Sequence, residues 1–227
     1  MKKNKRDCDL GSCFLCKYCL PEWKPAIEAN KKTISFKKGE VIFKEGEPVE
    51  GIYFVYSGTV KVHKKWGNEK ELIIRFAKSG DIIGHRGLGA EIIYPVTGTA
   101  LEPTTTCFIK LHFFNATLRI NNDFTIRLLM FYAEELQRSE RKMSNLAHMQ
   151  VKGRIADALI SLKNKFGIRT NGAVNITLSR QDLAAYAGTT YETVFRVLND
   201  FTSEGIISIS DKEIRILEEA SLGELTK

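Results

Sequence analysis

The chain has 227 residues, of which 43% are hydrophobic and 27% charged, a composition that is typical of a packed globular protein and excludes a disordered one. No apolar run reaches the ~18 residues that a membrane-spanning helix needs, and the basic start leads into cysteines rather than an apolar segment, so we expect a cytoplasmic protein without membrane contact. The net charge of +7 suggests a polyanionic partner but identifies none, because residues 151–227 hold ten basic and ten acidic residues.

A cysteine-rich arm, residues 1–24, begins the chain. Cys8, Cys13, Cys16 and Cys19 lie within twelve residues, and the fifth cysteine, Cys107, stands alone. A secreted disulfide scaffold would have a signal peptide and dispersed cysteine pairs, and neither is present. We therefore expect reduced thiols that serve metal or redox chemistry.

Residues 25–120 predict a domain of short antiparallel strands. Apolar runs of two to seven residues alternate with glycines, an even spacing that indicates a β-roll or barrel rather than βαβ units. The runs are Ile34–Phe36, Val41–Phe43, Ile52–Val55, Thr59–Val62, Leu72–Phe76, Ile82–Ile83, Val96–Ala100 and Thr105–Leu111.

Residues 121–150 predict one long helix, because no Gly or Pro interrupts them. A single apolar stripe on so long a helix favours a two-helix coiled coil, although Ser139 and Glu140 interrupt it. The alternative is an amphipathic helix that covers a core. The predicted dimer positions are Ile126, Leu129, Ala133, Leu136, Met143 and Leu146. The opposite face is expected to carry the charged residues Glu134, Glu135, Arg138, Glu140, Arg141 and Lys142.

Residues 151–227 predict a winged helix-turn-helix, which completes an α+β fold. A helix over Lys152–Phe166 and a short strand over Ala173–Thr177 come first. Two short helices then flank Gly188, which permits a tight turn. A hairpin of Ile206–Ile209 and Ile214–Leu217 forms the wing.

The residues at the starts of the two short helices are the candidates for DNA binding. Ser179 is a good N-cap for the first helix, where Arg180 is placed for a phosphate, and Thr189 or Thr190 caps the second. Arg can donate two hydrogen bonds to guanine, and Glu can accept one from cytosine. The alternative is a helical hairpin whose Glu and Arg form a surface pair. The exposed positions of the second helix are expected to be Tyr191, Glu192, Phe195 and Arg196.

Four motifs of the chain are Lys38-Gly-Glu-Val-Ile-Phe-Lys-Glu-Gly-Glu-Pro, Ile52-Tyr-Phe-Val-Tyr-Ser-Gly-Thr-Val-Lys-Val, Gly80-Asp-Ile-Ile-Gly and Glu192-Thr-Val-Phe-Arg. On these motifs and on the order of roll, long helix and winged helix-turn-helix, the chain resembles the Crp/Fnr family of bacterial transcription regulators over nearly its whole length. The resemblance implies a jelly roll like that of cyclic-nucleotide-binding domains, a homodimer, a near-palindromic DNA site and contact with RNA polymerase. Phe195 departs from the small residue that relatives often have at its position.

The resemblance also bears on the effector. Members that bind cyclic AMP have a Gly-Glu pair and a downstream Arg for the phosphate, whereas this chain has Gly84-His85 and Pro95-Val96-Thr97 there, so cyclic AMP is not expected. Oxygen-sensing members hold a 4Fe–4S cluster on three N-terminal cysteines and one cysteine of the roll. Carried over, this implies Cys13, Cys16, Cys19 and Cys107 as ligands, with Cys8 as an alternative because the last gap is narrower than in those sensors.

Three other interpretations of the sensor remain open. The four N-terminal cysteines suit Zn²⁺, or a reversible disulfide, and the roll can hold an unidentified small effector.

Two other classes of protein are disfavoured. A thiol oxidoreductase using Cys13-x-x-Cys16 lacks the βαβ pattern around it, and a cyclic-nucleotide module of a kinase or channel lacks the catalytic or membrane segment.

Overall fold

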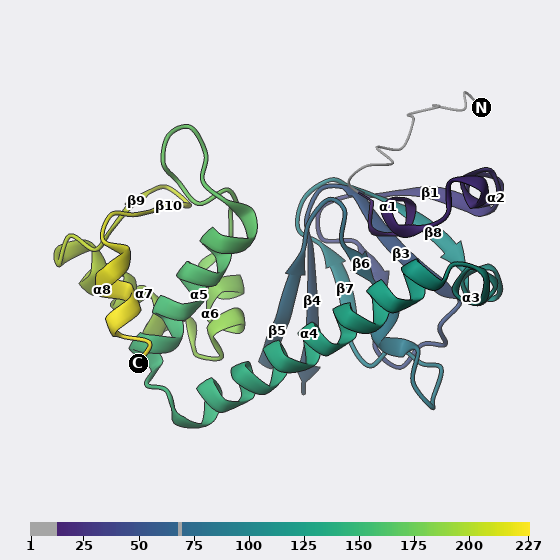
Figure 1. Cartoon of the computed structure of the whole chain (residues 1–227). Coiled ribbons are helices and arrows are strands. Elements are labelled where there is room, and N and C mark those ends of the chain that lie inside the picture. The colour runs from purple at the N-terminus through teal and green to yellow at the C-terminus, as the bar shows by residue number, and fades with distance from the viewer. Residues whose placement is uncertain (1–12, 68–69) are drawn as a thin grey trace. The chain divides into compact units, whose positions relative to one another are not determined.

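The computed structural model describes residues 13–67 and 70–227 (Figure 1). Two compact units are present. The first comprises the chain up to Lys64 together with Ile74–Leu136, and the second comprises Lys65–Ile73 together with Gln137–Lys227. In the part of the chain that is described, no helix is both long and apolar enough to cross a bilayer. The predicted α+β class is confirmed.

The predicted roll consists of two four-stranded sheets and, apart from residues 65–73, belongs to the first unit. One sheet has the strand order β1-β8-β3-β6 and the other β2-β7-β4-β5, and the pairings of β8 with β1 and β3 are antiparallel. Gly58 turns between β3 and β4 with φ 91°, a conformation that favours glycine, and a Cβ there would lie 2.5 Å from Thr104 Oγ1. The strands are β1 (Lys31–Phe36), β2 (Val41–Phe43), β3 (Gly51–Ser57), β4 (Val60–Trp66), β5 (Lys70–Ala77), β6 (Ile82–Ile83), β7 (Thr97–Ala100) and β8 (Thr104–Lys110).

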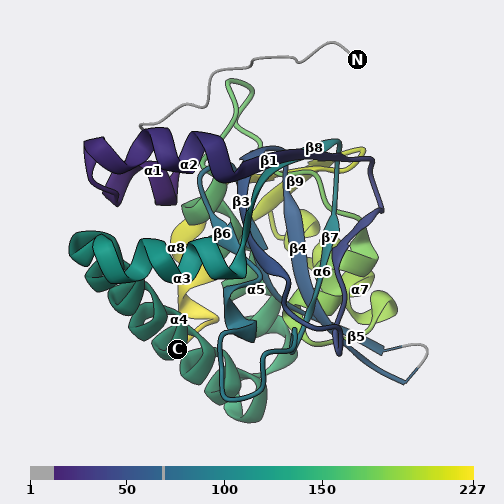
Figure 2. The same ribbon diagram turned by 90° about the vertical axis from the view of Figure 1, so that its right-hand side faces the viewer.

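Three short helices of the first unit have no counterpart in the prediction. They are α1 (Phe14–Tyr18), α2 (Lys24–Asn30) and α3 (Leu111–Ile120), with a 3₁₀ turn at Pro21–Trp23. The extension of the last strand to Leu111 was wrong, because Leu111 begins α3. Figure 2 shows α1 and α2 lying alongside α3. The contact is specific: the Trp23 ring stacks on Phe113 at 5.7 Å, and Trp23 Nε1 donates a hydrogen bond to Thr117 Oγ1.

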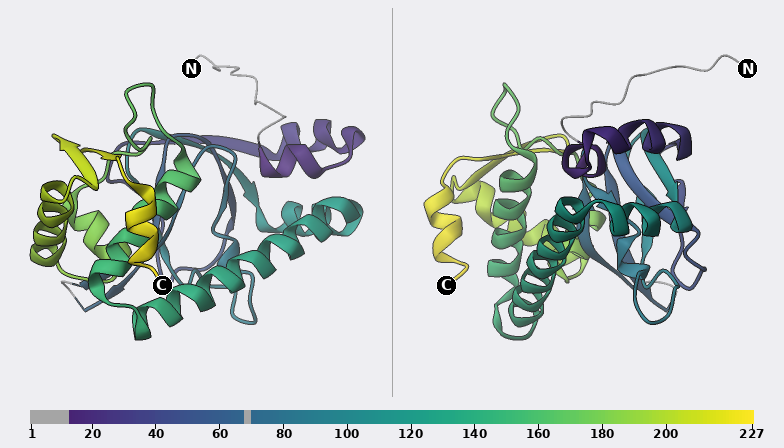
Figure 3. Two further views of the ribbon diagram at one scale, coloured as in Figure 1. Left: turned by 60° about the vertical axis from the view of Figure 1, so that its left-hand side comes forward. Right: turned by 45° about the vertical axis from the view of Figure 1, so that its right-hand side comes forward.

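The long helix α4 (Asn122–His148) matches the predicted helix within two residues at each end (Figure 3). Phe124 and Leu128 are buried in the core of the roll unit, and Phe131 packs against it. Glu135 continues this buried face, so its predicted exposure was wrong: the intervals of four, three and four residues place it on the same side of the helix as the three apolar residues. Leu129 and Leu136, on another face, are 67% and 60% exposed.

The second unit contains the predicted winged helix-turn-helix (Figure 3). The expected strand at Ala173–Thr177 was wrong, because only an isolated bridge joins Val174 to Ile168, and the amide of Val174 donates instead to the Ile214 carbonyl. A C-terminal helix was also not foreseen. The elements are α5 (Val151–Phe166), α6 (Arg180–Ala187), α7 (Tyr191–Ser203), β9 (Ile207–Ser210), β10 (Glu213–Ile216) and α8 (Glu219–Glu224).

Candidate DNA-binding surface and cysteine site

The turn between α6 and α7 forms for the local reasons that the sequence indicates. Ser179 Oγ accepts a hydrogen bond from the amide of Asp182 at 2.9 Å, and Thr190 rather than Thr189 caps α7, accepting from the Thr193 amide. Gly188 ends α6 in the left-handed region with φ 66° and ψ 45°. Arg154, on α5, donates to the carbonyl oxygens of both Ala187 and Gly188. These bonds fix where α7 begins.

One face of α7 is buried and the other is exposed. Val194, Val197, Leu198 and Phe201 are buried, as their spacing predicts. The rings of Tyr191 and Phe195, about half exposed, stack on each other with centroids 6.4 Å apart and an interplanar angle of 15°. This stack restricts the motion of Phe195 and was not foreseen, although the spacing of four residues allows it.

The charged residues of the surface differ in their surroundings. Glu192 and Arg196 are both exposed, one turn apart on α7. The pKa of Glu192 is lowered because its own backbone amide and the Thr190 hydroxyl donate to the carboxylate, so it is ionised at neutral pH. Arg180 is half-buried, and burial lowers its pKa while nearby Tyr191 opposes that effect. Its side chain is therefore less free than that of Arg196.

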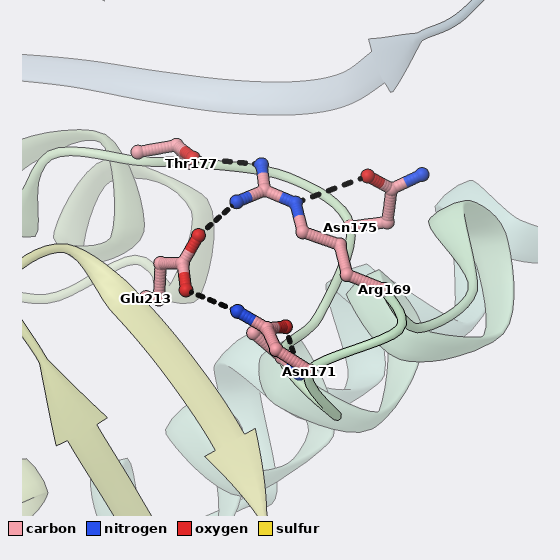
Figure 4. Close-up of polar contacts among 6 residues, drawn as sticks. Arg169, Asn171, Asn175, Thr177 and Glu213 are labelled. Atoms are coloured by element: carbon pink, nitrogen blue, oxygen red, sulfur yellow. Dashed lines mark hydrogen bonds and ion pairs between the residues drawn. The ribbon is translucent and has the colours of Figure 1, made fainter.

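A polar network connects the wing to the loop that precedes α6 (Figure 4). Arg169 pairs with Glu213 at the start of β10 and donates to Asn175 Oδ1 and Thr177 Oγ1. Asn171 donates to the other carboxylate oxygen of Glu213 at 2.8 Å. Glu213 thus joins two residues of the loop to one strand of the wing, which limits how the hairpin moves within its unit.

Three of the candidate cysteine ligands lie together around α1. Cys13 precedes the helix, Cys16 is within it and Cys19 follows it, and all three are buried. The pKa of Cys19 is raised to about 12 because burial disfavours the thiolate, with a further contribution from Cys13. Cys8 lies outside the described residues.

The fourth candidate, Cys107, lies on β8 between Thr33 of β1 and Phe54 of β3 and is also buried. It belongs to the same apolar core as the three cysteines around α1. Among residues 13–67 and 70–227, no three His, Cys, Asp or Glu side chains are arranged to hold a metal ion. Cys107 and the α1 cysteines therefore share a core, with no group of three arranged as metal ligands.

Helix α1 contacts α4, which the sequence did not indicate. The Phe14 ring lies 5.9 Å from that of Phe124 and 5.4 Å from that of Phe131, both on α4. The guanidinium of Arg127 lies 5.1 Å from the Tyr18 ring. The helix between the cysteines therefore packs directly on the predicted dimerisation helix.

The predicted dimer residues are mostly exposed. Ile126, Leu129, Leu136 and Met143 are between 59% and 67% exposed, and Ala133 is exposed as well. Leu146 differs, because it is half-buried and its side chain lies where a Cβ on Gly188 would be. An apolar stripe of this size is unusual for a surface helix that has no partner.

Comparison with known proteins covers both units. Residues 33–121 match the cyclic nucleotide-binding domain family, and residues 153–225 match the Crp-like helix-turn-helix domain family. The FixK2 structure from Bradyrhizobium japonicum is similar with a TM-score of 0.78 and 25% identity, over 87% of this chain and 98% of that one.

Curated relatives agree with these matches. The chain is 28% identical to transcriptional activator protein FnrA of Stutzerimonas stutzeri over 96% of this chain and 90% of the relative. It is 29% identical to the anaerobic regulatory protein of Bacillus subtilis, over 85% of this chain and 81% of that protein. Both relatives are regulators by name, and each is matched over most of its own length. The chain belongs to the Crp/Fnr family of DNA-binding transcription regulators.

Proposed function

We propose that this regulator responds to oxygen or redox state through a 4Fe–4S cluster held by Cys13, Cys16, Cys19 and Cys107. The observation that carries the proposal is the burial of all four thiols in one apolar core of the first unit. A relative with 29% identity is named an anaerobic regulatory protein, which supports the same class of signal.

The donor set fits the chemistry of such a cluster. Cysteine thiolates are its usual ligands, and an apolar shell limits the access of solvent to it. In a four-iron cluster each thiolate binds a different iron, so the ligands surround a larger body than the single ion of a zinc site. When bound, the cluster supplies a centre that oxygen can destroy. Binding requires thiolates, so it releases protons from buried thiols such as that of Cys19.

A cyclic nucleotide is a weaker candidate for the effector. The interior of the roll beside His85 contains a cavity of about 10 Å³, lined by residues that include Arg86 and Pro95. That volume accommodates about one water molecule. Arg86, the cation closest in sequence to the expected phosphate site, donates to Glu135 instead. Among the described residues that line this cavity, we therefore find no unpaired cation that could bind a cyclic phosphate.

The route from the cysteines to DNA in this proposal is α4. Phe14 and Tyr18 lie between the cysteines in sequence and contact α4 through Phe124, Phe131 and Arg127. A change in the cysteine site therefore alters the packing of α4, whose apolar stripe pairs with a second copy of the chain. The pair of helix-turn-helix units then binds the two halves of a near-palindromic operator. Contact with RNA polymerase remains a prediction from the family resemblance.

Metal analysis tests the cluster directly. Protein purified without oxygen is expected to be straw-brown and to contain about four iron and four sulphide per chain, as the cluster formula requires. Exposure to air should bleach the colour and release iron. Zinc without sulphide would support a zinc site. Protein that contains neither iron nor zinc and still responds to oxygen would support a disulfide. Either result contradicts the cluster.

Base recognition by α7 is tested with two arginine variants. Arg196→Ala should lose about 1–3 kcal/mol of discrimination at one or two positions of each half-site and leave non-specific binding almost unchanged, because a bidentate contact to guanine is lost. Arg180→Ala should weaken binding to all sequences alike and reduce the salt dependence by about one unit per half-site. Affinities for a panel of half-site variants at two salt concentrations separate these outcomes. Equal weakening of every site by Arg196→Ala would overturn this assignment of the recognition helix.

A further inference from the structure

A buried ion-pair cluster joins the roll to α4 within the first unit, and the function proposed above does not use it. Glu135 of α4 pairs with Arg75 of β5 at 3.2 Å and accepts a hydrogen bond from Arg86 Nη2 at 2.8 Å. The side chains of Glu135 and Arg75 are only 8% and 10% exposed, and that of Arg86 is 26% exposed. We call Arg75, Arg86 and Glu135 the Glu135 cluster.

Aromatic rings and a backbone carbonyl pack around the buried part of the cluster. The Arg75 guanidinium also donates to the Ile82 carbonyl and lies 5.5 Å from the Phe131 ring. His85 packs edge-on against Phe131, and Tyr132 donates a hydrogen bond to the His85 carbonyl oxygen. Around Glu135, the rings of Phe131 and Tyr132 on α4 thus contact Arg75 and His85 of the roll.

The charges make Glu135 hard to replace. Burial alone would raise the pKa of Glu135, but Arg75 and Arg86 outweigh it and lower the pKa to about 2, so the carboxylate is ionised. His85 does not add to the positive charge at neutral pH, because burial and Arg75 hold its pKa well below the ordinary value. The carboxylate therefore faces two cations, and without it the buried Arg75 would lose the negative charge that compensates it, which is strongly unfavourable.

The position of Glu135 on α4 connects this cluster to the dimer stripe. Ile126 precedes Glu135 by nine residues, which is two and a half turns, so the two lie on opposite sides of the helix. Leu136 follows by one residue, roughly 100° around the axis, and is exposed. Holding Glu135 on the roll therefore fixes which face of α4 is presented outward.

We infer that Glu135 is a positioning residue that sets the rotation of α4 on the roll and so orients the apolar stripe for a second copy of the chain. Apolar contacts are not directional, so apolar packing alone resists a rotation of α4 about its axis less than a directional contact does. A buried carboxylate between two guanidinium groups has one favourable arrangement, and buried polar groups are known to fix register in helical assemblies. The inference rests on the proposed dimerisation through α4.

The test compares Glu135→Gln with Glu134→Gln, a matched change at the exposed neighbouring residue. Glu135→Gln is expected to weaken the dimer at least tenfold in sedimentation equilibrium and to speed amide hydrogen exchange in residues 122–136. Exchange in the core strands β3 and β8 should stay as in the parent chain. Glu134→Gln should change neither quantity.

A double-mutant cycle tests whether the ion pair itself carries the effect. Arg86→Gln alone should also weaken the dimer, and Arg86→Gln combined with Glu135→Gln should weaken it by clearly less than the product of the two single fold-changes, because the two side chains act through one contact. If β3 and β8 lose protection in Glu135→Gln, the milder Glu135→Asp, which keeps the charge, supplies the same comparison with a smaller expected effect.

The inference is overturned if Glu135→Gln, or Glu135→Asp where that variant is needed, matches its control in both dimer affinity and helix exchange. It is also overturned if the effects of Arg86→Gln and Glu135→Gln are simply additive in the double variant. Failure of the proposed dimer itself is recognised separately, because Leu136→Glu would then leave the oligomeric state unchanged while the Glu135 variants still alter exchange in α4.

Discussion

Replacing Leu136 with Glu is expected to turn the dimer into monomers and to reduce affinity for the full operator at least 100-fold. Leu136 is 60% exposed at the middle of the apolar stripe of α4, so the change places a charge where the second helix would pack and leaves the fold of the roll unit intact. A monomer can bind only one half-site at a time, and losing the second contact costs about 10²–10⁴ in overall affinity.

Light scattering during size-exclusion chromatography measures the first effect, and fluorescence anisotropy on the full operator measures the second. Arg138→Glu provides the control, because it adds a glutamate two residues later, on the other side of the helix from the stripe. An unchanged dimer with full affinity in Leu136→Glu would show that α4 does not form the interface.

The second large effect is expected for the cysteine of the roll. Cys107→Ser should abolish the difference in operator occupancy between anaerobic and aerated protein, because a four-iron cluster that loses one of its four thiolates loses its attachment to β8. The change is small in volume, so the strand pairs with Thr33 and Phe54 should persist. Iron content, operator binding with and without air, and urea unfolding of the same preparation are the measurements.

Two companion variants sharpen this result. Thr105→Ser, two residues before Cys107 on β8, should leave iron content and response unchanged and serves as the matched control. Cys8→Ser should also be without effect if Cys13, Cys16 and Cys19 are the N-terminal ligands, and should abolish the response if Cys8 is one of them. A full response in Cys107→Ser, together with its loss in the N-terminal variants, would place the sensor in the arm alone and exclude a ligand on the roll.

The helix-turn-helix was the part most completely predicted from the sequence. Its signals are local: Ser179 and Thr190 cap helices that start within one residue of them, and Gly188 provides the left-handed turn. The spacing of Val194 and Phe201 also separates the buried from the exposed face of α7 without reference to the rest of the chain. Such signals span seven residues or fewer, so a sequence pattern is enough to find them.

The sequence predicted the strands of the roll but not the short helices that flank them. Alternating apolar runs and glycine turns are repeated often enough to identify an antiparallel sheet domain. Helices α1 to α3 are only five to ten residues long, and isolated helices of that length are marginal, so their sequences carry little helical signal. Their stability comes from contacts such as Trp23 with Phe113, ninety residues away in the sequence.

Glu135 marks the boundary between what the sequence alone determined and what only the tertiary structure decided. The sequence established the order of elements, the capped helices, the stripe of α4 and the cysteine inventory, because each depends on residue type and short spacing. It assigned Glu135 to an exposed charged face, since a carboxylate is normally solvated. The tertiary structure reverses that assignment, because Arg75 and Arg86, forty-nine or more residues earlier, both reach Glu135 and compensate for the loss of water. Pairings between distant charges depend on how the chain returns on itself, and no local pattern in this sequence records that.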